Sequence, residues 1–237
     1  MNIRHLNRVT PMSEILKSFD VKRIVIMGVL VFWCAAMIAV RVERTGSGYY
    51  RFLLTNLFLA SVPLVLSTGL RITYHRRSHW TIKVAIFGLW LLFLPNAPYI
   101  LTDILHLTRA SHAPAWYDLA LLLSCAGTGL LMGYLSLIDV EEIVASNFNS
   151  VVGWIFALLS LVLSGFAIYL GRFLRWNSWD VLISPTRLFD IAYGLMHPLS
   201  NGRPLAVTFV FGIILALGYI SVRILLANPG SHSKEGF

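Results

Sequence analysis

The chain has 237 residues, of which 57% are hydrophobic and only 13% are charged, and its formal net charge is +8. This composition excludes an ordinary soluble domain, in which about a quarter of the residues are charged. The positive charges lie in short segments beside apolar runs, a pattern that indicates contact with anionic lipid headgroups. No window offers the basic face of a soluble nucleic-acid-binding module, so we expect no nucleic-acid partner.

Six apolar runs are long enough to cross a bilayer, which takes roughly 20 residues as a helix. They lack the alternation of membrane β-strands, so the sequence predicts an all-α, polytopic transmembrane helical bundle. Residues 1–23 are predicted as a basic cytoplasmic segment, residues 24–226 as one membrane domain, and residues 227–237 as a flexible tail. The predicted spans cover residues 24–40, 52–70, 84–101, 119–138, 151–170 and 205–226.

The first span is preceded by a long basic region and followed directly by Arg41 and Arg44, which favours an uncleaved helix over a signal peptide. Residues 13–19 are predicted to form a short helix in the membrane plane. Cys34 and Cys125 lie inside predicted spans, where we expect them to pack as small apolar residues without forming a disulfide or a zinc site.

Eleven Lys and Arg residues fall on the membrane side that holds the termini and eight on the opposite side. The positive-inside rule then places both termini in the cytoplasm. Successive spans cross the membrane in opposite directions, so their order alone decides which loops share a side. Most of the polar and aromatic residues near the membrane surface fall on the side away from the termini, and we expect any chemistry there.

The third span is interrupted by Pro95 and Pro98, which remove backbone donors. If an α-helix restarts near Pro98, four polar residues recur with helical spacing and form one stripe: Tyr99, Thr102, Asp103 and His106. Ionisable groups at membrane depth are costly and indicate a functional site, in which Asp103 and His106 would together set protonation.

The fourth span begins with Asp118, which is interpreted either as a favourable charge at a helix N-terminus or as part of the polar site. Gly129 and Gly133 form a small-xxx-small pair that predicts close helix packing within the chain. The acidic cluster at the other end of this span, Asp139, Glu141 and Glu142, is expected to be a solvated helix end.

The fifth span ends in a segment with two arginines three residues apart, followed by aromatic and polar residues: Arg172, Arg175, Trp176, Asn177, Trp179 and Asp180. These residues are consistent with an interfacial belt, with internal ion pairs to Asp103 and Asp118, or with a clamp for an anionic group. Within the span, Ser160, Ser164 and Gly165 suit helix packing. Residues 184–197 then predict an amphipathic helix, as an interfacial anchor or as a lid over the polar side.

Metal binding is weakly indicated, because scattered ligands share one side without tight ligand spacing: Asp103, His106, His112, Asp118, Asp180 and His197. No HExxH, GxSxG or Walker motif is present, so we predict no metal, no cofactor and no assigned catalytic residue.

The segments that carry these residues resemble the DUF1361 family of uncharacterised bacterial integral membrane proteins. The resemblance rests on residues 56–60 with Pro63, residues 93–100 with Asp103 and His106, and the segments 114–118 and 171–180. It extends from about residue 51 to residue 226. It implies a multi-pass protein of the bacterial inner membrane without an assigned activity.

These observations lead to the hypothesis of a polar, charged site on the extracytoplasmic side that binds an anionic lipid headgroup or a small polar solute. The alternatives are a membrane-embedded enzyme acting on a lipid-linked substrate, with His106 or Asp118 as general base, and a transporter or structural subunit. The candidate ligand-binding residues are Asn96, Tyr99, Asp103, His106, Asp118, Arg172, Arg175, Trp176, Asn177 and Asp180.

Overall fold

The computed structural model describes residues 21–76, 78–109, 113–175 and 202–226. All regular structure in these residues is helical, and six helical segments are long and apolar enough to cross a membrane. This confirms the predicted all-α bundle. The helices predicted at residues 13–19 and 184–197 and the C-terminal tail lie outside the described residues.

Most helices extend beyond the predicted spans, because hydrophobicity marks only the part of a helix that lies in hydrocarbon. The third span is built from three pieces instead of one continuous helix. In chain order the elements are α2 (Val21–Thr45), η1 (Tyr49–Arg51), α3 (Phe52–His75), α4 (Trp80–Phe93), α5 (Asn96–Tyr99), η2 (Ile100–Arg109), α6 (Ala115–Asn147), α7 (Ser150–Phe173) and α10 (Arg203–Leu226).

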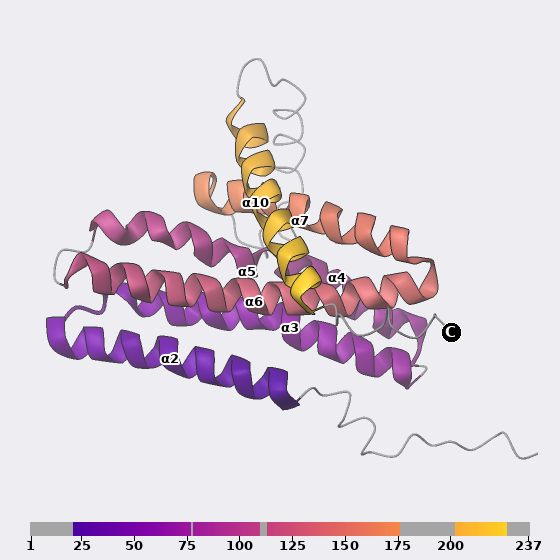
Figure 1. Ribbon diagram of the computed structural model, residues 1–237, viewed down its shortest axis with the longest axis horizontal. Helices are drawn as coiled ribbons and strands as arrows, with labels where there is room; N and C mark the ends of the chain where they lie inside the picture. Colours follow the sequence, from indigo (N-terminus) through magenta and orange to yellow (C-terminus); the bar gives the residue numbers. More distant parts are fainter. Residues whose placement is uncertain (1–20, 77, 110–112, 176–201, 227–237) are drawn as a thin grey trace, which may run out of the picture.

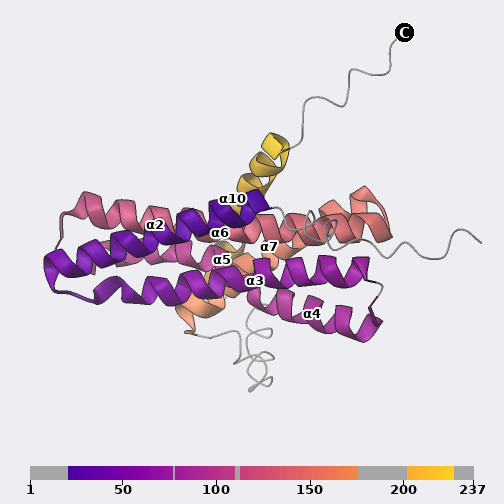
Figure 2. The ribbon, with the colours of Figure 1, turned by 90° about the horizontal axis from the view of Figure 1, so that it is seen from below.

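Helix α6 is the centre of the bundle. About 67% of its apolar window is buried inside the protein, compared with 22% to 39% for the other five spans. It contacts α2, α3, α5, η2, α7 and α10 (Figure 1). Figure 2 shows α2 and α3 running beside it; α2 is antiparallel to α6, and α3 is parallel to it.

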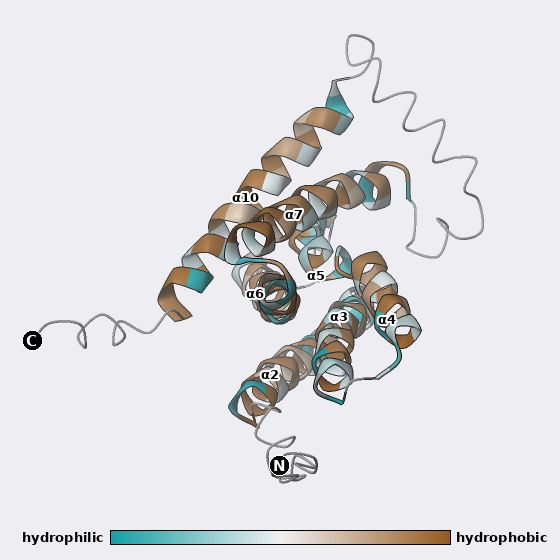
Figure 3. Ribbon diagram, turned by 90° about the vertical axis from the view of Figure 1, so that its right-hand side faces the viewer, coloured by the Kyte–Doolittle hydropathy of each residue, from teal (hydrophilic) through white to brown (hydrophobic). Residues whose placement is uncertain are grey.

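Helix α10 crosses the other helices at a steep angle and packs chiefly on α7 (Figure 3). Glycines make this close crossing feasible. A Cβ atom on Gly165 would lie 2.6 Å from the Thr208 carbonyl oxygen and 2.9 Å from the Gly212 nitrogen. The expected packing role of Gly165 is therefore confirmed.

The proline-containing segment replaces the α-helical restart expected from the sequence. Helix α4 ends at Phe93, α5 makes a single turn, and η2 continues as a 3₁₀ helix with three residues per turn. The Thr102 hydroxyl donates to the Tyr99 carbonyl oxygen at 2.7 Å and lies outside the polar cavity described below. The predicted four-residue stripe is thus wrong at Thr102, because a period of three aligns Asp103 with His106 but not with Thr102.

The small residues of α6 receive this broken segment. A Cβ atom on Gly129 would lie 2.9 Å from the Ala97 carbonyl oxygen, and one on Gly133 would lie 2.8 Å from the Ala97 Cβ. The two glycines therefore let the backbone of α5 approach α6 closely, as the small-xxx-small pair predicts.

A buried ion pair joins α6 to α2 at one end of the bundle. The guanidinium of Arg41 donates to both carboxylate oxygens of Asp118, at 2.6 Å and 3.1 Å, and both side chains are 1% exposed. The Arg41 guanidinium also lies over the Tyr50 ring, 4.5 Å from its centroid. Asp118 thus lies in the first turn of α6, as one interpretation of the sequence has it, but its ion pair is with Arg41 and not with the arginines of α7.

At the opposite end, α6 is joined to three helices through two acidic residues. Asp139 accepts from Arg23 of α2 at 2.9 Å and from Arg71 of α3 at 2.6 Å. Glu141 accepts two bonds from Arg223 of α10, at 3.0 Å and 3.2 Å. Both acidic residues are 2% exposed, so the expectation of a solvated helix end is wrong for them. That expectation did not include the arginines of helices that are distant in the sequence.

We expect Arg41→Met or Asp118→Leu alone to lower the free energy of unfolding by about 3–5 kcal/mol, because each leaves a buried charge without its partner. The double variant Arg41→Met/Asp118→Leu should be more stable than either single variant. Unfolding in a mild detergent measures this, with Arg44→Ala, exposed on the same helix, as the control. Equal stability of all four variants would contradict the assignment.

Two glycines of α6 give a test of the close approach to α5. Gly127→Ala adds a Cβ in open space and should stabilise the helix by up to about 1 kcal/mol. Gly129→Ala makes the same chemical change but pushes against Ala97, so we expect it to lower the melting temperature. If both substitutions shift the melting temperature in the same direction, α5 does not contact α6 as described.

Candidate functional site

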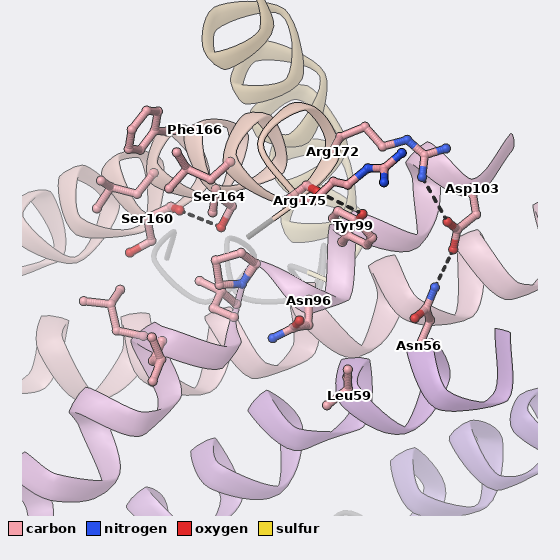
Figure 4. A pocket seen from close by; sticks show the side chains of 18 of the residues that line it. Asn56, Leu59, Asn96, Tyr99, Asp103, Ser160, Ser164, Phe166, Arg172 and Arg175 are labelled. Atoms are coloured by element: carbon pink, nitrogen blue, oxygen red, sulfur yellow. Dashed lines mark hydrogen bonds and ion pairs between the residues drawn. The ribbon is translucent and has the colours of Figure 1, made fainter. Parts of the chain in front are cut away.

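A cavity of about 720 Å³ lies between α3, α4, the α5–η2 segment and α7. Figure 4 shows the charged groups at one end of it, with Ser160 and Phe166 at the other. Most of its wall is apolar. Its lining residues include Asn56, Gly88, Leu91, Leu92, Asn96, Tyr99, Asp103, His106, Ser160, Leu163, Ser164, Phe166, Arg172 and Arg175.

Asp103 is the buried acid at the polar end, and its residue is 1% exposed. Its Oδ2 accepts a hydrogen bond of 2.7 Å from the Asn56 side-chain amide of α3. Its Oδ1 lies 3.7 Å from the nearest guanidinium nitrogen of Arg172. The carboxylate is thus held by one neutral donor and one cation, which is how buried charge is tolerated.

His106 lies one 3₁₀ turn beyond Asp103, between Tyr49 and Arg172. Its Nε2 is 3.3 Å from Nη1 of Arg172, and its Nδ1 is 3.3 Å from the Tyr49 hydroxyl. A guanidinium can only donate, so this geometry requires Nε2 to accept and places the imidazole proton on Nδ1. The structure therefore fits a neutral His106.

Arg172 and Arg175 come from the C-terminal end of α7, where cations complement the helix dipole. Arg172 donates to the Thr102 carbonyl oxygen at 2.9 Å and so ties α7 to η2. Arg175 follows the helix with a φ of 56°, the left-handed conformation that terminates many helices. Its side chain is exposed and makes no ion pair with any carboxylate among the residues that the structure describes.

The rest of the cavity is apolar with a few satisfied hydroxyls. Leu91 and Leu92 of α4 face Leu163 and Phe166 of α7 across it. Ser160 and Ser164 also line it, and each hydroxyl donates at 2.9 Å to a carbonyl four residues earlier in α7. Since that carbonyl partner satisfies each hydroxyl donor, this part of the cavity offers mostly carbon surface.

The structure brings six of the ten candidate ligand-binding residues to this cavity: Asn96, Tyr99, Asp103, His106, Arg172 and Arg175. Asn96 donates to the Phe93 carbonyl oxygen at 3.0 Å, and the Tyr99 hydroxyl donates to that of Gly171 at 3.5 Å. Asp118 lies elsewhere, in its ion pair with Arg41. Trp176, Asn177 and Asp180 lie outside the described residues.

Sequence reasoning missed two features of the site. Tyr49, the partner of His106, lies in the short η1 turn, and an interfacial tyrosine carries no signal for a specific partner. The apolar wall was also missed, because leucines that line a cavity look the same in sequence as leucines that face lipid. The sequence gives only one weak indication of this wall, which is Gly88, a small residue in the middle of an apolar helix.

The structure describes only some of the residues that the sequence suggests as metal ligands. Among the described residues, no group of three or more His, Cys, Asp or Glu side chains gathers closely enough to hold a metal ion. His112, Asp180 and His197 lie outside that part of the chain.

Comparison with known proteins gives one result. A family model described as "Protein of unknown function (DUF1361)" matches residues 55–217, which is more than half of the chain. We found no significant match among curated proteins or among solved structures.

A double-mutant cycle tests the polar end of the cavity. Arg172→Met leaves the buried Asp103 carboxylate without its cation, whereas Asp103→Asn leaves a guanidinium that is 18% exposed. We therefore expect Arg172→Met to destabilise more than Asp103→Asn, with a coupling energy of about 1–3 kcal/mol from detergent unfolding. Additive effects of the two substitutions would show that the charges do not interact.

Proposed function

Since the chain belongs to the DUF1361 family of proteins of unknown function, we propose its function from the cavity: it is a membrane protein that binds an anionic group between α3, η2 and α7. The observation that carries this proposal is the surplus of positive charge at the polar end. Arg172 and Arg175 face one carboxylate, that of Asp103, and the geometry of His106 fits a neutral ring.

The two arginines differ in what they contribute. Arg172 is oriented by Thr102, His106 and Asp103, so its position is fixed before a ligand arrives. Arg175 is exposed and has no carboxylate partner among the described residues, so its charge is available. Guanidinium groups suit phosphate and carboxylate, because their donors match two oxygen atoms at once.

The charge distribution supports a proposal for the side of the membrane on which the site lies. The polar end lies on the membrane side opposite the start of α2 and the end of α10, and the sequence predicts eleven of the nineteen Lys and Arg residues on the side of those two helix ends. The positive-inside rule supports cytoplasmic termini, which would place the site on the extracytoplasmic side of a bacterial inner membrane.

An enzyme acting on a lipid-linked substrate is a second candidate, favoured by His106. Its Nε2 faces Arg172 at the polar end of the cavity, and an anion that drew the guanidinium away would leave this nitrogen as a base. Asp118, the other base considered from the sequence, is sealed by Arg41 and is excluded from this role.

Arg175→Gly is the most informative variant for the binding proposal, because glycine adopts a positive φ without strain, so the guanidinium is removed while the backbone conformation is kept. Phosphorus NMR line broadening of glycerol phosphate by the detergent-solubilised protein detects even millimolar binding. We expect Arg175→Gly and Arg172→Met each to weaken binding about tenfold, equal to one lost charged contact of about 1.4 kcal/mol.

The control for this experiment is Arg44→Ala, which removes an exposed arginine from the same side of the membrane but outside the cavity. It should bind glycerol phosphate as the unmodified protein does. Unchanged binding in Arg175→Gly and Arg172→Met, or equal weakening in Arg44→Ala, would contradict the proposal. The arginines would then contact lipid headgroups at the interface without forming a specific site.

A further inference from the structure

The cavity opens through the side wall of the bundle. Gly88 of α4 and Leu163 of α7 both line it, yet both are exposed at the outer surface, and Leu163 is 53% exposed. A Cβ atom on Gly88 would meet nothing within 4 Å, so the glycine leaves a gap in the wall. The interior of the cavity is therefore continuous with the surroundings of the helices between α4 and α7.

This opening lies at the depth of the hydrocarbon core. Helices α4 and α7 start on the same side of the membrane, at Trp80 and Ser150. At 1.5 Å per residue, Gly88 is about 12 Å and Leu163 about 20 Å along these helices. The hydrocarbon core is about 30 Å thick, so a molecule that passes between these two residues comes from the acyl chains of the lipid.

An aromatic cluster joins α4 to α7 one helical turn before Ser160, the cavity-lining residue of α7 that is farthest along the helix from the arginines. Phe87 and Trp90 of α4 lie 5.8 Å and 5.9 Å from the Phe156 ring of α7, centroid to centroid. Trp90 is fully buried and donates to the Ser136 hydroxyl of α6 at 2.7 Å. The three rings fix the spacing of α4 and α7 beside the cavity, although none of these residues lines it.

The volume of the cavity exceeds what a polar headgroup needs. Its 720 Å³ is the share of roughly 24 liquid water molecules, and most of the wall between Ser160 and the arginines is carbon. A small hydrophilic solute at Arg172 and Arg175 would leave that apolar part filled with poorly bonded water. A ligand with a hydrocarbon chain would fill it, since apolar surface favours apolar contact.

We infer that the ligand of this site is a membrane lipid with an anionic headgroup, one acyl chain of which enters sideways between Gly88 and Leu163. The inference rests on the proposed function, because the same arginines hold the headgroup. The inference identifies the ligand as a lipid and not as a soluble anion. The chain lies along Leu91, Leu92 and Phe166 and ends near Ser160.

The test uses the full-length protein in nanodiscs that contain phosphatidylglycerol with a photoactivatable diazirine in the middle of one acyl chain. Mass spectrometry then locates the adducts. In the unmodified protein we expect them to concentrate on the cavity-lining parts of α4 and α7. Adducts spread evenly over the lipid-facing surfaces of α2 and α10 would overturn the inference, even without any variant.

Gly88→Trp fills the opening and leaves the arginines untouched. Adducts on α4 and α7 should fall at least about tenfold, because an indole occupies the space that the chain requires. Gly28→Trp is the matched control, since Gly28 also lies exposed in a spanning helix with nothing within 4 Å, but outside the cavity. The Gly28→Trp variant should give the same adducts on α4 and α7 as the unmodified protein. Undiminished adducts in Gly88→Trp would overturn the inference.

Glycerol phosphate binding separates this inference from the proposed function. Gly88→Trp should still broaden the phosphorus signal, because the headgroup site is intact. If the unmodified protein binds glycerol phosphate but gives no adducts on α4 and α7, the lipid inference fails and the anion site stands. If the unmodified protein shows no binding of glycerol phosphate, the proposed function itself fails.

Discussion

The register between α2 and α6 is the constraint on which the rest of the structure depends. These antiparallel helices are joined at both ends, by Arg41 with Asp118 and by Arg23 with Asp139. The two arginines are about 27 Å apart along α2, and the two acids about 32 Å apart along α6. Both distances are close to the thickness of the hydrocarbon core, so each ion pair lies near a membrane surface. Sliding one helix by a turn would break both pairs at once and leave the buried charges of Arg41 and Asp118 without their ion-pair partners. The central helix is therefore fixed at a defined depth.

The fixed central helix in turn determines where the site lies. Gly129 and Gly133 of α6 accept Ala97, which positions the interrupted third span against the middle of the bundle. From there η2 carries Asp103 and His106 toward α7, where Arg172 joins them. The polar cluster is thus assembled from residues of α3, η2 and α7, and its ion pair is separate from the two that join α2 to α6. The depth of the cluster still follows from them, because every one of these elements packs directly or indirectly on α6.

The sequence predicts the number and type of the helices well, because twenty-residue apolar runs have few alternatives in a bilayer. It also points to the interruption at Pro95 and Pro98, and most of the described polar residues around it do line one cavity. It fails where the outcome depends on pairing between distant segments. Asp118, Asp139 and Glu141 each look like ordinary helix-end acids, and only the fold reveals that arginines of α2, α3 and α10 reach them. The apolar half of the cavity has no sequence signal either, since a leucine facing a void and a leucine facing lipid obey the same preference.

The 3₁₀ form of η2 has a consequence for the geometry of the site. This helix type rises about 2.0 Å per residue, whereas an α-helix rises 1.5 Å, so ten residues are about 5 Å longer than they would be as an α-helix. The segment acts as a spacer that carries the imidazole of His106 closer to the membrane surface than its sequence position implies. It also keeps His106 in line with Asp103, which an α-helix would rotate out of alignment by about 60°. Helix type, independent of residue type, thereby decides how far the imidazole lies from the lipid phosphates.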